Sequence, residues 1–154
     1  MIRCYGLFWH ADRVFWGRQN NPGALFGTRS VSSGAVRIDF RDQRGIYALY
    51  ADYDLVYVGQ TGAEDSRLFS RLKVHRDDHL SERWNRFSWF GTRWVTKQHH
   101  LAADAQAAHP TTATALNILE AVAIAVAEPR LNLQRGRWGD ATQYIQVRDS
   151  RLDE

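Results

Sequence analysis

The chain has 154 residues, a length that accommodates one domain with a sizeable hydrophobic core. Hydrophobic residues make up 44% of the chain and charged residues 24%, a composition that excludes an intrinsically disordered protein. The formal net charge of +3 and the calculated pI of about 9.3 favour a polyanionic partner.

The sequence has no apolar run long enough to cross a bilayer and no secretory signal pattern at its start. Cys4 is the single cysteine, so an internal disulfide is impossible, in agreement with a reducing compartment. No histidine near Cys4 is an evident partner that would make it a nucleophile, and we expect a small core residue. These features predict a soluble cytoplasmic protein without membrane association.

Residues 1–44 carry short apolar runs around 2–9, 14–17 and 36–40, which predict two or three strands. Residues 20–23 (NNPG) form a turn signal between them. Six arginines are spread through this segment: Arg13, Arg18, Arg29, Arg37, Arg41 and Arg44. Two interpretations are open, because these side chains either follow a phosphate backbone or solvate the surface.

Residues 45–51 and 55–59 are β-branched and aromatic runs separated by a short polar segment, and they predict a β-hairpin. Tyr47 and Tyr57 lie on its neighbouring strands, where two phenols can face one site. The same pattern is also typical of an ordinary core hairpin.

Residues 67–75 predict a helix after a polar loop, with Arg71 and His75 four residues apart on one face. His79 follows His75 by four residues, a spacing that also occurs in zinc sites. A zinc site needs a third ligand and usually a glutamate beside the first histidine, and neither is visible. We therefore expect His79 to cap the helix or pack against it.

Residues 83–97 combine four basic residues with no acidic ones. Five aromatic residues are interleaved with them: Trp84, Phe87, Trp89, Phe90 and Trp94. The alternation over 87–95 predicts a third strand that packs in the core. In the other interpretation the segment has a mixed role, with Arg83, Arg86 and Arg93 facing nucleic acid while aromatic faces stack on bases.

Residues 111–127 predict a helix that is apolar on nearly every side and stops before Pro129. Glu120 interrupts this apolar surface. A buried, unpaired carboxylate costs several kcal/mol, so Glu120 needs a cation or a position at a cleft. A last strand or an extended tail is predicted over 143–148.

Five short motifs occur in order along the chain: 45–47 (GIY), 57–61 (YVGQT), 71–75 (RLKVH), 119–120 (LE) and 129–132 (PRLN). Together they resemble the GIY-YIG nuclease superfamily, which includes the N-terminal nuclease domain of a bacterial excision-repair endonuclease and several homing and restriction endonucleases. The resemblance covers 45–132. It implies an α+β fold with a small central antiparallel sheet, whose three-stranded core is flanked by helices, and here a β-rich N-terminal extension precedes that core.

The resemblance also implies a single domain with three parts. We expect an N-terminal extension over 1–44, the nuclease core over 45–134 and a C-terminal tail over 135–154. None of these parts is long enough for a separate DNA-recognition domain. Specificity is then expected from the extension, from the basic and aromatic strand, from a homodimer or from a partner protein.

The active-site set that the resemblance implies consists of five residues: Tyr47, Tyr57, Arg71, His75 and Glu120. Arg67 is an alternative to Arg71, because it also precedes a leucine and fits the shorter loop of many family members. Arg71 is preferred, since Leu72 and His75 follow it in the family pattern. Asn132 matches the family asparagine.

The chemistry expected from this set is hydrolysis of a phosphodiester. Glu120 is expected to hold Mg²⁺, with Mn²⁺ as a possible substitute, because Mg²⁺ prefers oxygen ligands. Arg71 clamps the phosphate oxygens, and one tyrosine deprotonates the attacking water. A phenol has a pKa of about 10, so a nearby cation such as Arg71, Lys73 or the metal must lower it. His75 shares the proton or holds the phosphate.

The sequence thus predicts a metal-dependent endonuclease that acts on DNA. The alternatives are a nucleic-acid-binding module that is non-catalytic or partner-dependent, and a purely structural domain. The side chains expected to contact nucleic acid are Arg67, Lys73, Arg83, Arg86, Arg93 and Asn132.

Overall fold

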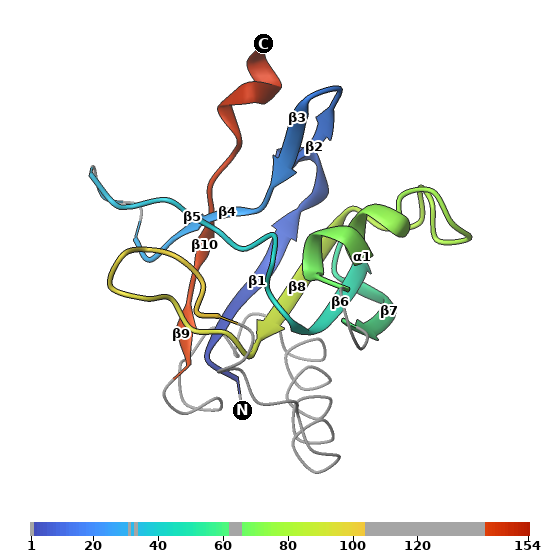
Figure 1. The fold of residues 1–154 in the computed structure, drawn as a ribbon. Helices are drawn as coiled ribbons and strands as arrows, with labels where there is room; N and C mark the ends of the chain where they lie inside the picture. The colour runs from blue at the N-terminus through green and yellow to red at the C-terminus, as the bar shows by residue number, and fades with distance from the viewer. Residues whose placement is uncertain (1, 31, 33, 62–65, 104–140) are drawn as a thin grey trace.

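The computed structural model describes residues 2–30, 32, 34–61, 66–103 and 141–154 (Figure 1). These residues form mainly β-strands, together with one short α-helix, α1 (Leu68–Val74), and two 3-10 helices, Ala11–Arg13 and Ser150–Asp153. The α+β expectation is therefore met only in part, because the described structure is mostly β. The helix predicted over 111–127 lies outside the described residues.

The largest sheet has five strands in the order β7-β6-β8-β1-β9. Its members are β1 (Cys4–His10), β6 (Gly45–Ala51), β7 (Asp54–Gln60), β8 (Arg86–Gly91) and β9 (Thr142–Gln143). The first four strands in this order pair antiparallel, whereas β9 runs parallel to β1, so the sheet is mixed. The antiparallel strands β7, β6 and β8 are thus extended at one side by β1 and β9, which come from the two ends of the chain.

Two small sheets flank the large one (Figure 1). One contains β10 (Ile145–Gln146), β4 (Phe26–Thr28) and β5 (Ile38–Asp39), and the other is the hairpin of β2 (Phe15–Arg18) and β3 (Asn21–Ala24). The strands predicted in residues 1–44 are present as β1, β2 and β5, whereas β3 and β4 were not predicted. The turn of this hairpin lies at 19–20, before most of the expected turn at 20–23. Asn21 and Pro22 already belong to β3.

The β6–β7 hairpin has the predicted form, and Gly45 shows why its first strand begins with glycine. Gly45 has a φ of +145°, and a Cβ at this position would overlap the carbonyl oxygen of Phe90 on β8. Only glycine tolerates both the backbone conformation and so close an approach of another strand. The first residue of the GIY motif therefore permits β6 to pair with β8.

Alternating residues of the sheet enter two separate apolar clusters. Tyr47 and Leu49 of β6 pack in the cluster that also contains Leu72 of α1, whereas Ile46 and Tyr50 belong to the cluster of the opposite face. This period of two is the expected result of side chains that point to alternate faces of a strand. Helix α1 therefore lies against one face of the sheet and brings its C-terminal end close to the hairpin (Figure 1).

The aromatic residues of 83–97 are mostly core residues. Trp84, Phe87, Trp89 and Phe90 are buried, and β8 ends at Gly91, so Trp94 lies beyond the strand. These four rings are not exposed to stack on bases, and the interpretation as a core strand is confirmed. Cys4 is also buried, as expected for a core residue, and burial raises the pKa of its thiol to about 12.

Several of the N-terminal arginines lie over aromatic rings. The guanidinium carbon of Arg37 is 3.9 Å from the Phe26 ring centroid, and that of Arg41 is 4.8 Å from the Phe69 ring centroid. Arg41 also donates to the carbonyl oxygen of Gly23. Such cation–π contacts contribute to packing, so these two side chains do more than solvate the surface. Within the described part of the chain, no helix is long and apolar enough to cross a membrane.

Candidate functional site

Three of the predicted site residues meet between the hairpin and the end of α1. The phenol oxygen of Tyr47 lies 2.7 Å from Nε2 of His75. The ring centroids of Tyr57 and His75 are 4.9 Å apart, and those of Tyr47 and Tyr57 are 6.2 Å apart. Strands β6 and β7 and the C-cap of α1 thus contribute one side chain each to a single cluster.

Strand register brings the two tyrosines to the same face. Tyr47 pairs with Gly59 and Leu49 pairs with Tyr57, so both phenols lie on the face that α1 covers. A Cβ at Gly59 would lie 2.5 Å from the Tyr47 phenol oxygen and 2.6 Å from its Cζ atom. Gly59 therefore leaves the space that the Tyr47 ring occupies, which is a physical reason for glycine in the second hairpin motif.

Arg71 lies beside both phenols, one helical turn before His75. Burial raises the pKa of Tyr47, and the hydrogen bond and positive charge of Arg71 oppose this increase without reversing it. Arg71 thus acts on the Tyr47 pKa in the expected direction, but desolvation of the phenolate outweighs it and the pKa of Tyr47 is raised. Tyr47 remains a neutral O–H donor near pH 7.

The Nε atom of Arg71 is buried and has no hydrogen-bond partner among the described residues. A buried guanidinium N–H without a partner is costly unless a ligand satisfies it, and phosphate oxygens are suitable acceptors. Arg67 occupies the N-cap of α1, where its backbone N–H donates to Ser70 Oγ at 3.1 Å. Of the two candidate arginines, Arg71 and not Arg67 therefore lies beside the phenols of Tyr47 and Tyr57.

Asp78 extends the cluster and was not predicted as a site residue. Its Oδ2 atom lies 2.8 Å from Nδ1 of His75, and its Oδ1 atom accepts the backbone N–H of Leu80 at 2.8 Å. Partial desolvation opposes its charge, but the Leu80 N–H and the His75 contact outweigh that effect and lower the pKa of Asp78. Its position three residues after His75 is the signal in the sequence that places it beside this ring.

The zinc interpretation finds no support in the described ranges, where no group of three His, Cys, Asp or Glu side chains could hold a metal ion. His79 is 76% exposed and the C-cap of α1 is His75, so the expectation that His79 caps the helix or packs against it is wrong. His75 itself is only 2% exposed, and its carbonyl oxygen accepts the indole N–H of Trp84 at 3.0 Å. Its ring and backbone are therefore both held in place.

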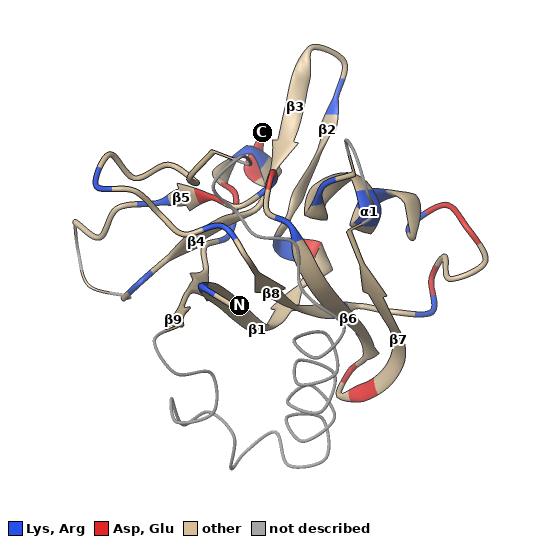
Figure 2. Cartoon of the chain, turned by 60° about the horizontal axis from the view of Figure 1, so that its bottom comes forward, with Lys and Arg blue, Asp and Glu red and all other residues tan. Residues whose placement is uncertain are grey.

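The described residues among the predicted nucleic-acid contacts lie on different elements. Arg86 opens β8 and donates to the phenol oxygen of Tyr53 at 3.2 Å, whereas Arg93 follows β8 and donates to the carbonyl oxygen of Asp42 at 2.7 Å. Lys73 and Arg83 are exposed on α1 and on the loop before β8. Figure 2 shows basic positions on several separate elements. Glu120 and Asn132 lie outside the described residues.

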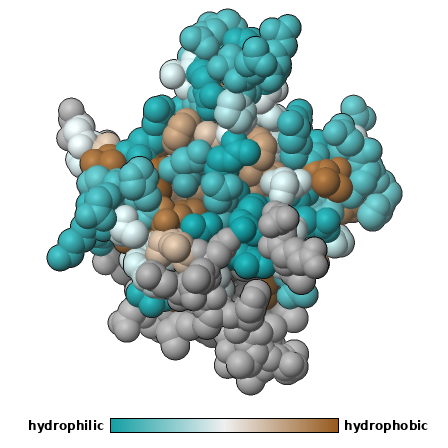
Figure 3. Space-filling view, in the orientation of Figure 1, coloured by the Kyte–Doolittle hydropathy of each residue, from teal (hydrophilic) through white to brown (hydrophobic). Residues whose placement is uncertain are grey.

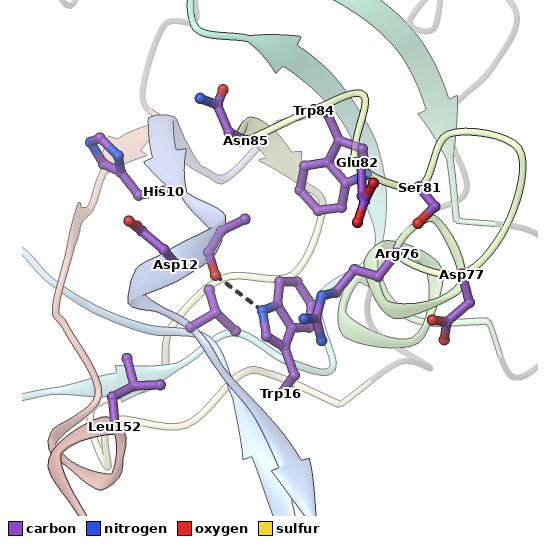
Figure 4. Close-up of a pocket in the computed structure, with 12 residues that line it drawn as sticks. His10, Asp12, Trp16, Arg76, Asp77, Ser81, Glu82, Trp84, Asn85 and Leu152 are labelled. Carbon is purple, nitrogen blue, oxygen red and sulfur yellow. Dashed lines mark hydrogen bonds between the residues drawn. The ribbon is translucent and has the colours of Figure 1, made fainter.

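A cavity of about 730 Å³ lies beyond Trp84 (Figure 4). Trp84 and Trp16 meet edge to face with ring centroids 6.3 Å apart, and the guanidinium carbon of Arg76 is 4.7 Å from the Trp16 ring centroid. Of the described catalytic candidates, none lines this cavity. Trp84 connects the two regions, because its ring lines the cavity while its N–H holds the His75 backbone.

The cluster joins a guanidinium to a continuous chain of phenol, imidazole and carboxylate. Such a chain can accept a proton from a bound molecule while the guanidinium stabilises negative charge. Comparisons of the chain with protein-family models, with curated proteins and with solved structures found no match. The function is therefore inferred from the chemistry and geometry of these residues.

Proposed function

We propose that the protein is a metal-dependent endonuclease of the GIY-YIG type, which hydrolyses phosphodiester bonds in DNA. One observation carries the proposal: Tyr47, Tyr57, Arg71 and His75 come from three separate elements and lie together. The adjacent antiparallel strands β7, β6 and β8, with α1 packed on one face, agree with the three-stranded core of that superfamily.

The proposed reaction uses the phenol–imidazole pair as the base. A water molecule gives one proton to the Tyr47 oxygen while the proton of Tyr47 passes to Nε2 of His75. The hydroxide oxygen forms a bond to phosphorus, and the bond from phosphorus to the leaving oxygen breaks with its electron pair on that oxygen. Arg71 donates N–H groups to the phosphate oxygens as their negative charge increases. A proton from solvent neutralises the leaving oxygen, and His75 returns its extra proton to solvent.

Glu120 is the residue proposed to hold Mg²⁺ or Mn²⁺, and it lies outside the described residues. A single carboxylate suffices for Mg²⁺ when water molecules and substrate phosphate oxygens complete its coordination. The bound ion would supply Lewis-acid stabilisation of the phosphate and of the leaving oxygen. In the proposed reaction the described side chains transfer protons and bind the phosphate.

The test is cleavage of supercoiled plasmid and of single-stranded DNA by the wild-type protein and by Glu120→Ala, each with Mg²⁺ and with EDTA. We expect cleavage that requires the metal and falls by about 10²-fold or more in the variant, because loss of a catalytic metal costs several kcal/mol. Glu82→Ala, at an exposed loop position, is the matched control and should cleave normally. A folded wild-type protein that binds both DNAs and cleaves neither would overturn the proposal.

A second candidate is a nucleic-acid-binding module that is non-catalytic or depends on a partner. Helix α1 favours it, because the helix carries Arg71 and Lys73 and no acidic residue (Figure 2). Substitution of Arg71 by alanine separates the two functions, since a nuclease loses cleavage while a binding module loses affinity. A homodimer or a partner protein remains a prediction.

The face in Figure 3 is mainly hydrophilic with separate apolar areas.

A further inference from the structure

The carboxylate of Asp78 is held from two sides next to the candidate base. Its Oδ1 atom accepts the Leu80 backbone N–H at 2.8 Å, and its Oδ2 atom lies 2.8 Å from Nδ1 of His75. The backbone N–H of Asp78 donates to the carbonyl oxygen of Val74, the last residue of α1, at 3.1 Å. This hydrogen bond fixes the main chain of Asp78 to the end of the helix. The carboxylate is therefore oriented before any substrate binds.

An ionised carboxylate only accepts hydrogen bonds, so Nδ1 of His75 must carry a proton to bind Asp78. In the neutral imidazole the other nitrogen, Nε2, then has a free lone pair. The Tyr47 phenol lies 2.7 Å from that nitrogen, so a lone pair on Nε2 can accept its O–H. The arrangement selects one of the two neutral tautomers of His75, and this tautomer is the one that can accept the Tyr47 proton.

We infer that Asp78 is a positioning residue that holds His75 as the Nδ1–H tautomer and so makes Nε2 the acceptor of the Tyr47 proton. The inference rests on the proposed function for its catalytic consequence, although the tautomer itself is independent of any activity. When the water proton reaches Tyr47 and the Tyr47 proton reaches Nε2, His75 becomes an imidazolium with both nitrogens protonated. The Asp78 carboxylate then faces a full positive charge and stabilises it.

The other charged or titratable groups around His75 fit this arrangement. Tyr57 lies against the ring with centroids 4.9 Å apart, and Arg71 is on the preceding helical turn. His79 approaches the same Asp78 oxygen at 4.0 Å from an exposed position. Among these neighbours Asp78 is the single anion, so no other described group in the cluster can replace it as the acceptor for Nδ1–H.

The test combines NMR of the imidazole ring with cleavage assays on the full chain. In ¹⁵N-labelled wild-type protein without DNA, we expect the ring nitrogen shifts of His75 to report a protonated Nδ1 and an unprotonated Nε2. In Asp78→Asn the amide oxygen can still accept the Leu80 N–H, and the amide NH₂ then faces Nδ1. We expect the tautomer to change to Nε2–H and cleavage to fall by about 10²- to 10⁴-fold, as in other His–Asp pairs.

Asp77→Asn is the matched control, because Asp77 is the exposed neighbour and should leave both the tautomer and cleavage unchanged. An Nε2–H tautomer in the wild-type protein overturns the inference without any variant, so a misfolded Asp78→Asn does not leave the question open. Equal cleavage by Asp78→Asn and wild type overturns the positioning role and leaves the nuclease proposal intact. A wild-type protein with the expected tautomer but no cleavage supports the tautomer assignment and counts against the nuclease.

Discussion

Tyr47 and Tyr57 face the same cluster but have different environments. Tyr47 is fully buried, and its oxygen is hydrogen bonded to His75, whereas Tyr57 is partly exposed and touches the imidazole through its ring. Removing one partner of a buried hydrogen bond costs more than removing a polar atom that water can solvate. The two phenols therefore contribute differently to stability even if both are needed for activity.

We expect Tyr47→Phe to lower the free energy of unfolding by about 1–3 kcal/mol, because it leaves Nε2 of His75 buried without a partner. Tyr57→Phe should change it by less than about 0.5 kcal/mol, the range of a substitution that breaks no buried contact. Urea denaturation at pH 7 measures both variants against the wild type. Equal losses in the two variants would contradict the assigned hydrogen bond.

Helix α1 shows how a short element positions the site. Its seven residues are too few for a stable isolated helix, so its stability must come from packing. Leu68, Phe69 and Leu72 are buried and belong to the core cluster that also contains residues of β6 and β8, and the Phe69 ring lies 5.5 Å from the Trp16 ring of β2 between centroids. This packing determines where Arg71 and His75 lie relative to the hairpin tyrosines.

We expect Leu72→Ala to destabilise the protein by about 2–5 kcal/mol, the range for a large-to-small substitution in a core. Val74→Ala on the same helix is the control. Val74 is 49% exposed, so its truncation should cost less than about 0.5 kcal/mol. Thermal or urea unfolding measures the difference, and similar losses in the two variants would show that α1 does not pack as described.

At the scale of the molecule, the two ends of the chain complete the fold. Strand β9 pairs with β1 and β10 pairs with β4, so residues after 140 pair with strands from the first 30 residues. Arg151 binds the buried Asp149 at 2.7 Å, lies over the Phe15 ring and donates to the Pro22 carbonyl oxygen at 3.0 Å. The 1–44 and 141–154 segments are thus integral to the described sheets.

The Asp149–Arg151 pair predicts a pH dependence of stability. The hydrogen bond from Arg151 lowers the pKa of Asp149 in the folded protein. A lowered pKa stabilises the folded state above the unfolded pKa of about 3.9, and this contribution is lost as the pH falls through the folded value. Asp149→Asn should therefore cost about 1–2 kcal/mol at pH 6–7 and progressively less below pH 4.

Unfolding by urea between pH 2.5 and 7 measures this dependence. Asp153→Asn is the control, because Asp153 forms an exposed ion pair with Arg148, and such pairs contribute about 0–1 kcal/mol. If Asp149→Asn lowered the free energy of unfolding by the same amount at every pH from 2.5 to 7, the charge of Asp149 would not be the cause of its contribution.

Much of the local structure and most of the candidate site could be predicted from the order of the amino acids. The β6–β7 hairpin and α1 could be predicted because apolar periodicity and turn residues act over a few neighbouring positions. Tyr47, Tyr57, Arg71 and His75 could be selected because they stand in the ordered motifs that resemble the GIY-YIG superfamily.

Which side chains meet, and in which chemical state, depends on the folded chain. Tyr47 and His75 are 28 residues apart, and their hydrogen bond depends on strand register and on how α1 packs. Burial, which no local pattern reports, raises the pKa of Tyr47 against the influence of Arg71. Asp78 becomes a site residue only because the chain after α1 turns it back toward the ring of His75. Contacts between distant residues, and the desolvation they cause, arise only when the elements pack together.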